Sequence, residues 1–288
     1  MLAFIGMVNA QDLPLQNNGE VDKISDHYCQ DLQSALEQEI SNNKVWKNLV
    51  DRNLMSVGII DMNNIDDIQY AGINDTNMMY AASLPKIAVL LAAMDAIDKG
   101  QLANSKDIQK DMRAMISKSN NQATTRMIDR VGYEKIEEVL RMPKHDLYNE
   151  EVGGGLWVGK RYAAGGRRYP EPMKGLSHAA TTRQVCSFYY QLAMGNLVNE
   201  TRSRQMLNIM EKPALHHKFV NTLMRIAPQA RIFRKSGSWK NYHSDSVLVW
   251  GPDRKYVMVA LIDDSRGEQI IRDLVIPLEK VMKKSRSL

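Results

Sequence analysis

The sequence predicts an α+β fold in which an antiparallel sheet is formed from both chain ends and carries flanking helices. Strand-like runs gather before residue 80 and after residue 230, and helical patterns fill the interval between them. The turn Gly251-Pro252-Asp253 joins the last two runs as a hairpin. We therefore expect one domain over residues 22–288, with an α/β lobe at about 22–80 and 230–288. An all-helical lobe at about 81–229 is inserted into it.

The elements follow from the spacing of apolar residues. Helical spacing, as in Ile24, Tyr28, Leu32, Leu36 and Ile40, predicts helices at about 24–40, 83–99, 105–117, 122–130, 133–141, 181–197, 200–210 and 266–284. Runs typical of strands occupy about 54–61, 68–71, 230–239, 246–250 and 256–262. Residues 143–176 are rich in glycine and proline, which predicts a long irregular segment of the kind that often carries function.

Composition narrows the function classes. The chain has 288 residues, of which 44% are hydrophobic, and this is enough for one compact unit with a substantial core. The net charge of +5 is dispersed among acidic residues, so we expect solubility and weak attraction to anionic surfaces rather than a nucleic-acid partner. We also expect a monomer. The six histidines show no metal-ligand spacing, and Cys29 and Cys186 either pair or stay free. We expect no metal and no cofactor.

The N-terminal residues predict export. Residues 1–10 are apolar and end in Val8-Asn9-Ala10, small residues at the positions that a signal peptidase reads. A frayed strand is the alternative for this stretch, and residues 11–21 form a polar segment after it. No later apolar run has the length of a membrane span, so we expect a periplasmic or secreted protein without an integral membrane segment.

A serine with a lysine three residues later marks the first candidate site. Ser83-Leu84-Pro85-Lys86 opens the most apolar helical run of the chain, where the amine of Lys86 can reach the Ser83 hydroxyl. A serine beside a buried amine at a helix start could be an activated nucleophile. The pattern alone is weak, because Ser41 and Lys44 match it as well and serine is an ordinary helix cap.

Two further short sequences follow in order. Ser119-Asn120-Asn121 falls in a break between two predicted helices, and Lys235-Ser236-Gly237-Ser238 lies on the strand before the final hairpin. Ser-x-x-Lys, Ser-Asp-Asn and Lys-Thr-Gly are together the signature of class A β-lactamases and penicillin-binding proteins. Over residues 22–288 the chain therefore resembles the serine β-lactamase and penicillin-binding-protein superfamily, closest to class A enzymes.

The resemblance implies catalytic roles for four residues. Ser83 would attack a carbonyl carbon and form an acyl-enzyme, and neutral Lys86 would take the serine proton. Ser119, held between Lys86 and Lys235, would relay a proton to the leaving nitrogen. Asn121 would offer its amide to an amide of the substrate.

The last of the three sequences would bind substrate. Lys235 and Ser236 would hold a substrate carboxylate by charge and hydroxyl donation, and Gly237 would let the substrate lie against the strand. The backbone N–H groups of Ser83 and Ser238 would form an oxyanion hole, in which each donor typically contributes about 3 kcal/mol. For each residue a capping, turn or surface role is the alternative.

One expected element is missing. Class A enzymes carry a Glu-x-x-Leu-Asn loop whose glutamate positions the water that releases the acyl group, and the chain has no such sequence. Glu171, between Pro170 and Pro172, is the better carboxylate candidate for that water, ahead of Glu150 and Glu151, although a solvated loop charge is its commoner fate. The aromatic residues Trp157, Tyr162 and Tyr169 of the same segment either line the site or pack the loop, with packing as the default, and Lys160 and His178 have no assigned role.

Three functions remain open on the sequence. The first is an exported serine hydrolase that acts on β-lactams or D-alanyl-peptide-like amides through an acyl-enzyme on Ser83. The second is a penicillin-binding or sensing protein that is acylated without efficient turnover, which the missing glutamate loop favours. The third is an esterase or amidase for an unrelated small acyl substrate, using the same residues.

Overall fold

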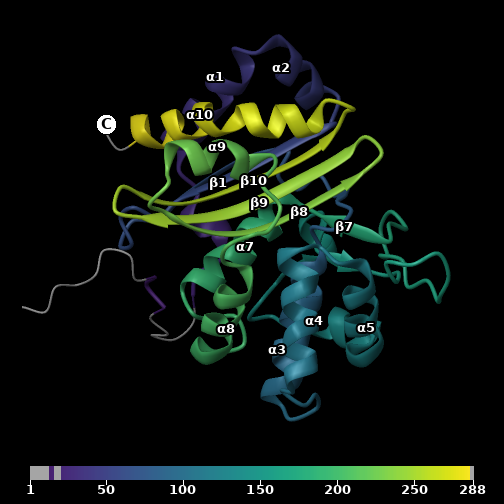
Figure 1. The fold of residues 1–288 in the computed structure, drawn as a ribbon. Helices are drawn as coiled ribbons and strands as arrows, with labels where there is room; N and C mark the ends of the chain where they lie inside the picture. Colours follow the sequence, from purple (N-terminus) through teal and green to yellow (C-terminus); the bar gives the residue numbers. More distant parts are fainter. Residues whose placement is uncertain (1–12, 16–20, 286–288) are drawn as a thin grey trace, which may run out of the picture.

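A five-stranded antiparallel sheet forms the centre of the computed structural model, which describes residues 13–15 and 21–285 (Figure 1). The strand order is β2-β1-β10-β9-β8, so the two chain ends interleave as predicted. The strands are β1 Met55–Asp61, β2 Gln69–Ile73, β8 Arg231–Trp239, β9 Tyr242–Gly251 and β10 Arg254–Asp263. β8 is an edge strand, and it is the strand that carries Lys235 to Ser238.

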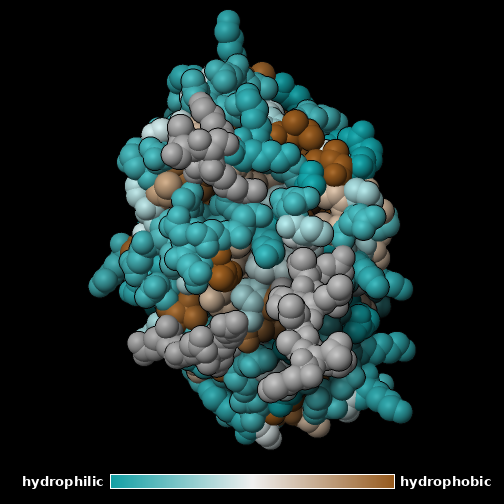
Figure 2. All heavy atoms as spheres, turned by 90° about the vertical axis from the view of Figure 1, so that its left-hand side faces the viewer, coloured by the Kyte–Doolittle hydropathy of each residue, from teal (hydrophilic) through white to brown (hydrophobic). Residues whose placement is uncertain are grey.

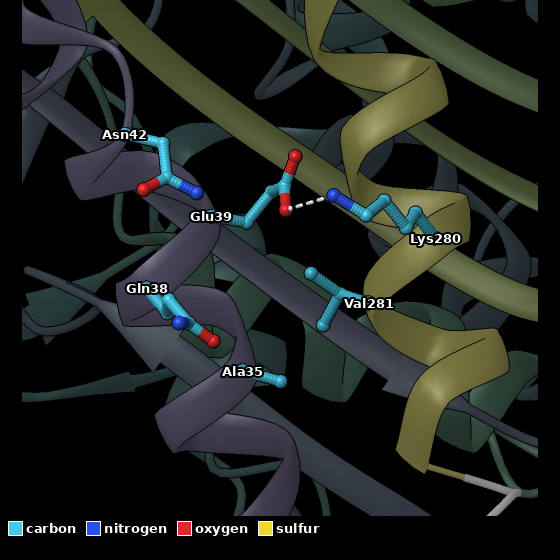
Figure 3. Close-up of a pocket in the computed structure, with 6 residues that line it drawn as sticks. All are labelled: Ala35, Gln38, Glu39, Asn42, Lys280 and Val281. Atoms are coloured by element: carbon cyan, nitrogen blue, oxygen red, sulfur yellow. Dashed lines mark hydrogen bonds and ion pairs between the residues drawn. The ribbon is translucent and has the colours of Figure 1, made fainter.

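Alternate residues of the sheet build two separate cores. On β9, Leu248 and Trp250 join one apolar cluster, while Val247 and Val249 join the other. This alternation is the period of a strand whose two faces are both covered. One face is covered by four helices, namely α1 Gln30–Ser41, α2 Lys44–Asp51, α9 Phe219–Ile226 and α10 Gly267–Ser285. The groove between α1 and α10 is closed by an ion pair of 2.9 Å between Glu39 and Lys280 (Figure 3).

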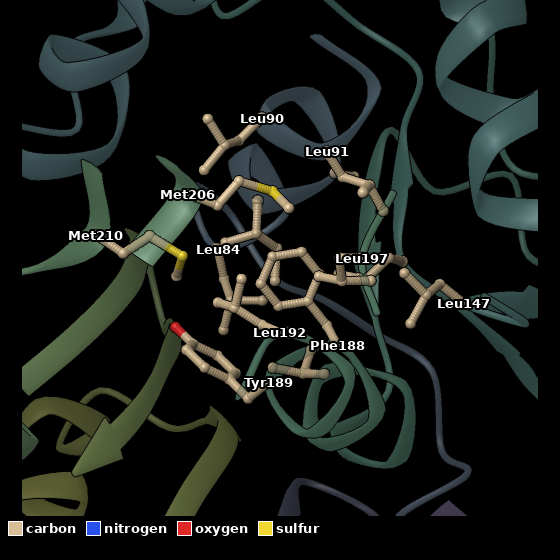
Figure 4. Packing of buried hydrophobic residues seen from close by; sticks show 14 of the residues in the cluster. Leu84, Leu90, Leu91, Leu147, Phe188, Tyr189, Leu192, Leu197, Met206 and Met210 are labelled. Carbon is tan, nitrogen blue, oxygen red and sulfur yellow. The ribbon is translucent and has the colours of Figure 1, made fainter. Parts of the chain in front are cut away.

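The helical lobe lies against the other face, where α7 makes the most extensive contact with the sheet and α8 and α4 contact β8 (Figure 1). Its helices are α3 Lys86–Asp98, α4 Lys106–Ser117, α5 Asn121–Val131, α6 Tyr133–Arg141, α7 Thr182–Ala193 and α8 Glu200–Met210. α3 is buried over nearly its whole length, because its residues from Lys86 to Ile97 are all buried. Leu84, Leu90 and Phe188 belong to the packed interior of this lobe (Figure 4), and Leu84 directly follows Ser83 in the chain.

Short strands and turns between the lobes position the candidate site. β3 Met79–Tyr80, β6 Trp157–Val158 and β7 His178–Ala180 form a small sheet, and β4 Tyr148–Asn149 pairs with β5 Gly154–Gly155. The 3-10 turns are η1 Ile24–His27 and η2 Glu150–Val152. The segment that is predicted to be irregular, 143–176, thus contains the two-residue strands β4, β5 and β6 and the short turn η2, and it is irregular elsewhere.

The structure confirms the predicted fold class and most elements, but the short strands β3 to β7 were not predicted, and the helices differ as follows. The helix predicted at 24–40 is interrupted at Tyr28 and Cys29, because the Cys29 N–H donates to the Tyr70 carbonyl across the edge of the sheet. α2 and α9 were not predicted, because eight residues give too little periodicity. α9 lies within the stretch assigned to the helical lobe, yet it packs on α10 and β9.

The surface and the termini give little information about function. The face shown in Figure 2 is mostly hydrophilic, with hydrophobic residues in small scattered groups. Within the described residues no helix is long and apolar enough to cross a membrane. Cys29 and Cys186 are free thiols, and Cys186 is buried. The predicted signal peptide, residues 1–10, lies outside the described residues.

Candidate active site

Ser83 lies in a tight turn between β3 and α3. The preceding residue, Ala82, has a left-handed φ of 49°, a conformation that non-glycine residues rarely adopt and that clusters at functional sites. The helix itself begins at Lys86, so the expectation that Ser83 opens it is wrong by three residues. Leu84 and Pro85 complete the turn, in which Ser83 is partly exposed while its neighbours in the chain from Ala81 to Lys86 are buried.

Lys86 is fully buried at the start of α3. Its Nζ donates to the Ser119 carbonyl and to Asn121 Oδ1, both at 2.7 Å. Burial lowers the pKa of Lys86 to about 7, so the neutral amine is well populated at neutral pH. A neutral amine has two N–H groups and one lone pair; the two carbonyl acceptors take both N–H groups and leave the lone pair to accept a proton.

Ser119 joins the two lysines of the site. It follows α4 with a left-handed φ of 54°; its Oγ accepts from Lys235 Nζ at 3.0 Å and lies 3.4 Å from Lys86 Nζ, on the side left to the lone pair of the neutral amine. The next residue, Asn120, braces this turn by capping α5, since its Oδ1 accepts from the Ala123 N–H at 2.8 Å. The asparagine at this position therefore holds the loop by a hydrogen bond.

Asn121 contacts Lys86 through its side-chain oxygen. Its Oδ1 is held by Lys86, which leaves the NH₂ group of this exposed side chain as the part that can meet a substrate. In the described part of the chain no hydrogen bond joins Lys86 to Ser83 Oγ. The structure thus brings Lys86, Ser119, Asn121 and Lys235 into one hydrogen-bonded group beside Ser83.

Lys235 is buried on β8 at the other side of Ser119. Besides Ser119, its Nζ donates to the carbonyl of Ser236 at 2.6 Å. Burial, with the positive charges of Lys86 and Arg234, holds the pKa of Lys235 well below its ordinary value. An incoming carboxylate would favour the charged amine again, so the residue is suited to bind an anion.

Gly237 brings the edge strand against the nucleophile turn. A Cβ at this residue would lie 2.5 Å from the Ser83 backbone nitrogen and 2.4 Å from the Ala81 carbonyl oxygen. Only a residue without a side chain permits this approach. The Ser83 amide and the edge of β8 with Ser238 therefore lie together, as an oxyanion hole requires.

Lys218 fixes this edge of the strand from behind. The side chain is fully buried, and its Nζ donates to the Gly237 carbonyl, to Ser238 Oγ at 2.8 Å and to the Ser244 carbonyl at 3.0 Å. Burial lowers the pKa of Lys218 to about 8. Because the Gly237 carbonyl belongs to the peptide that carries the Ser238 N–H, Lys218 holds the orientation of that peptide.

A buried ion pair supports the same strand. Arg234 Nε donates to Asp245 Oδ1 at 2.7 Å, and a second guanidinium nitrogen donates to Oδ2 at 3.0 Å. The Phe219 N–H at the start of α9 also donates to Asp245, at 3.1 Å. The pair is almost fully buried and satisfied on both sides, so it ties β8, β9 and α9 together next to the site.

Glu171 is a buried carboxylate with structural partners. Its oxygens accept from the Tyr148 hydroxyl at 3.0 Å and from the backbone N–H groups of Met173, at 2.6 Å, and Lys174. Only 1% of the residue is exposed, so it is not the solvated loop charge that is the commoner case. In the described part of the chain no hydrogen bond links Glu171 to Ser83 or Lys86. The carboxylate closes the 171–176 loop.

Tyr162 covers Lys86 from the irregular segment. Its ring centroid lies 4.4 Å from Lys86 Nζ, and its hydroxyl donates to the Ala82 carbonyl at 3.0 Å. The ring packs on His178 at 4.2 Å, and burial lowers the pKa of that imidazole to about 4, so it is neutral. His178 Nε2 contacts the Lys160 carbonyl at 3.0 Å and thereby holds the segment in place.

The other two aromatic residues of that segment pack the loop. Trp157 and Tyr169 stack with their ring centroids 5.8 Å apart, and Tyr169 stacks in the same way on Tyr133 of α6. The Trp157 indole N–H donates to the Tyr169 carbonyl at 2.7 Å. Trp157 and Tyr169 therefore pack the loop, as the default expectation has it, whereas Tyr162 lies at the candidate site.

Comparison with known proteins decides the family. A family model described as the β-lactamase enzyme family matches residues 43–113 and 105–276. The chain belongs to this family. A search of curated protein sequences found no match.

Solved structures show the same fold at low identity. A β-lactamase from Sphaerobacter thermophilus is 16% identical, with a TM-score of 0.68 over 86% of this chain and 97% of its own. The protein PBP-A is 17% identical, with a TM-score of 0.66 over 92% of this chain and all of its own. A PBP-A mutant in an acyl-enzyme complex with penicillin G has a TM-score of 0.67 and the same identity and coverage. The β-lactamase fold is thereby shown.

Three residues near the β-lactamase-like site were missed by sequence reasoning. Lys218 and the Arg234–Asp245 pair carry no sequence signal, because their roles depend on contacts between β8, β9 and the α9 start. The described residues contain no cluster of three or more side chains suited to hold a metal ion.

Proposed function

We propose that the protein forms an acyl-enzyme on Ser83 from β-lactams and D-alanyl-peptide-like amides. The observation that carries this proposal is the position of the Ser119 hydroxyl, which bridges two buried lysines beside the Ser83 turn. Such a bridge connects the base of the attack with the group that must protonate the leaving nitrogen.

The chemistry needs only proton transfers and an oxyanion site. Lys86, neutral before reaction, accepts the Ser83 proton as Oγ bonds to the amide carbonyl carbon. The carbonyl oxygen becomes negative and is stabilised by the N–H groups of Ser83 and Ser238. When the C–N bond breaks, Ser119 donates its proton to the nitrogen and takes one back from protonated Lys86. The products are the acyl-enzyme and a neutral amine nitrogen.

The substrate class follows from the cationic side of the site. Lys235 is buried with its amine on Ser119, and Ser236 lies beside it, so an anionic group next to the scissile amide would meet a cation and a hydroxyl. Penicillins and peptides that end in D-alanine both place a carboxylate near the scissile amide. A PBP-A variant forms an acyl-enzyme with penicillin G, and because this chain shares only the fold with that protein, the fold alone supports this substrate class.

Slow release of the acyl group is the second part of the proposal. Glu171 is engaged by Tyr148 and by loop N–H groups, so it is poorly placed to activate water at Ser83. Tyr162 covers one face of Lys86 and so limits water there. We therefore favour a penicillin-binding activity with slow turnover over an efficient β-lactamase.

Export remains part of the proposal. The apolar residues 1–10, with the small side chains at Val8-Asn9-Ala10, support a periplasmic or secreted location. N-terminal sequencing of the protein from the culture or periplasmic fraction tests it: cleavage after Ala10 is expected, and an intact residue 1 in the cytoplasm would contradict it.

Labelling with a fluorescent penicillin tests the nucleophile. We expect the wild-type protein to be labelled and Ser83→Ala to show no label while it keeps the same unfolding midpoint. Ser41→Ala is the matched control, because Ser41 and Lys44 repeat the same spacing on an exposed helix end. Undiminished labelling of Ser83→Ala, or loss of label in Ser41→Ala, would contradict the assignment.

A further inference from the structure

A chain of three side chains runs from the candidate substrate site to the surface. Ser236 Oγ lies 3.5 Å from His217 Nε2, and His217 Nδ1 lies 3.3 Å from Glu268 Oε2. Ser236 is nearly fully buried on β8, whereas His217 is partly exposed just before α9 and Glu268 lies in the first turn of α10. The serine of the proposed anion site is thus connected to a titratable ring.

The backbone is anchored at His217 and at the residue that follows it, and this restricts where the ring can lie. The His217 carbonyl accepts from an Arg234 guanidinium nitrogen at 3.2 Å. The following residue, Lys218, is held by its three contacts to β8 and β9. Arg272, one turn along α10, donates to Glu268 at 3.4 Å and steadies the carboxylate that faces the ring.

The carboxylate fixes the tautomer of the neutral ring. An ionised Glu268 can only accept, so the proton of neutral His217 belongs on Nδ1, and Nε2 carries a lone pair. The Ser236 hydroxyl then donates to Nε2 and turns its oxygen lone pairs toward the site. A substrate carboxylate arriving in this state meets lone pairs instead of a donor.

A second proton on the ring reverses this arrangement. Nε2–H then donates to Ser236 Oγ, and the hydroxyl proton of Ser236 is free to donate to a carboxylate. The imidazolium also adds positive charge beside Lys235. We infer that His217, acting as a positioning residue through Ser236, makes the site prefer substrates with a carboxylate when its ring is protonated. This inference rests on the proposed acylation of Ser83.

The charges around the ring set the direction of its response. Burial, then Arg234 and Lys218, lower the pKa of His217, while Asp245 and the hydrogen bond to Glu268 oppose them. The net pKa lies below the ordinary value, so the ring of the free protein is mostly neutral at neutral pH. Binding of a carboxylate favours the imidazolium, and the preference for carboxylate substrates therefore grows as the pH falls.

A ratio of two substrates isolates this effect from the base. The acylation rate constants for a penicillin and for its methyl ester are measured from about pH 5 to about pH 8, a range in which the carboxylate stays ionised. Both substrates need neutral Lys86, so its titration cancels in the ratio. We expect the ratio of acid to ester to rise about tenfold toward low pH in the wild type, the size of one charge-assisted hydrogen bond.

Variants separate the role of the ring from a structural one. His217→Gln keeps a permanent donor and cannot titrate, so it should lose the part of the rise that comes from His217, and its ratio should stay above that of His217→Ala. Glu268→Gln removes the carboxylate that favours the imidazolium, so the rise should move to lower pH. His216→Gln is the matched control, because the neighbouring imidazole is exposed and contacts the Pro213 carbonyl instead of Ser236; it should behave as the wild type.

The possible outcomes distinguish a failure of the role of His217 from a failure of the proposed acylation of Ser83. A flat ratio in the wild type, or an unchanged slope in His217→Gln, would overturn the role of His217 while Ser83 acylation stands. If neither substrate acylates Ser83 at any pH, the proposed function itself is wrong and the inference falls with it.

Discussion

Replacing Gly237 by alanine tests the oxyanion site most sharply. The new methyl carbon would lie 2.5 Å from the Ser83 nitrogen and 2.4 Å from the Ala81 carbonyl oxygen, and both partners are backbone atoms that cannot rotate away. Ordinary contact begins near 3.4 Å, so β8 and the Ser83 turn must separate by about 0.9 Å. Oxyanion donors act only at about 2.7–3.1 Å from the oxygen, and losing one costs about 3 kcal/mol.

The expected result is a fall in the acylation rate of about 10²- to 10³-fold, with the fold retained. The assay is the second-order rate of covalent labelling by a chromogenic β-lactam, with a thermal unfolding curve to verify the fold. Gly165→Ala is the matched control, because a Cβ there meets no atom within 4 Å. If Gly237→Ala acylates within about threefold of wild type, Gly237 does not bring the two oxyanion donors together.

The remaining predictions concern the base, the ion pair and the aromatic cover. The acylation rate should rise with pH through a midpoint of about 7, because neutral Lys86 accepts the proton. Lys86→Met should lower this rate at least about 100-fold. A rate that is independent of pH between about 5 and 9 would exclude Lys86 as the base. Arg234→Met should lower the free energy of unfolding by about 3–5 kcal/mol, because Asp245 stays buried without its cation; urea denaturation measures this, and a loss below about 1 kcal/mol would show the pair to be dispensable. Tyr162→Ala should expose Lys86 to water. The midpoint of the acylation rate should then move up by about one pH unit, and the acyl group should be lost faster. If the midpoint and the release rate do not change, Tyr162 has only a packing role.

The sequence predicted those site residues and secondary-structure elements that short-range residue spacing encodes. Ser83, Ser119 and Lys235 were found because each stands in a short recognisable sequence, and the order of the three matches the order of β3, the α4–α5 turn and β8. The helices of the lobe were predicted from periodicity because their buried faces are long. Local patterns also predicted the hairpin of β9 and β10, but β9 begins at Tyr242, four residues before the predicted run at 246–250.

Contacts between distant segments were not predictable in the same way. Lys218 and His217 stand in a stretch without periodicity, and they gain their partners only because α9 folds back beside β8. Tyr162 looked like packing, as Trp157 and Tyr169 are, until the loop placed its ring over Lys86. Helix spacing suggested that Ser83 begins α3, whereas the turn at Ala82 delays the helix to Lys86.

The central claim is that Ser83 is acylated and releases its acyl group slowly, and one time course tests it directly. Benzylpenicillin is mixed with the protein, and intact mass is followed while peptide mapping locates the adduct. A persistent adduct of one whole penicillin on the peptide that contains Ser83 is the predicted result. An adduct that disappears as rapidly as product forms would contradict slow release, and the absence of any adduct on Ser83 would contradict the claim as a whole.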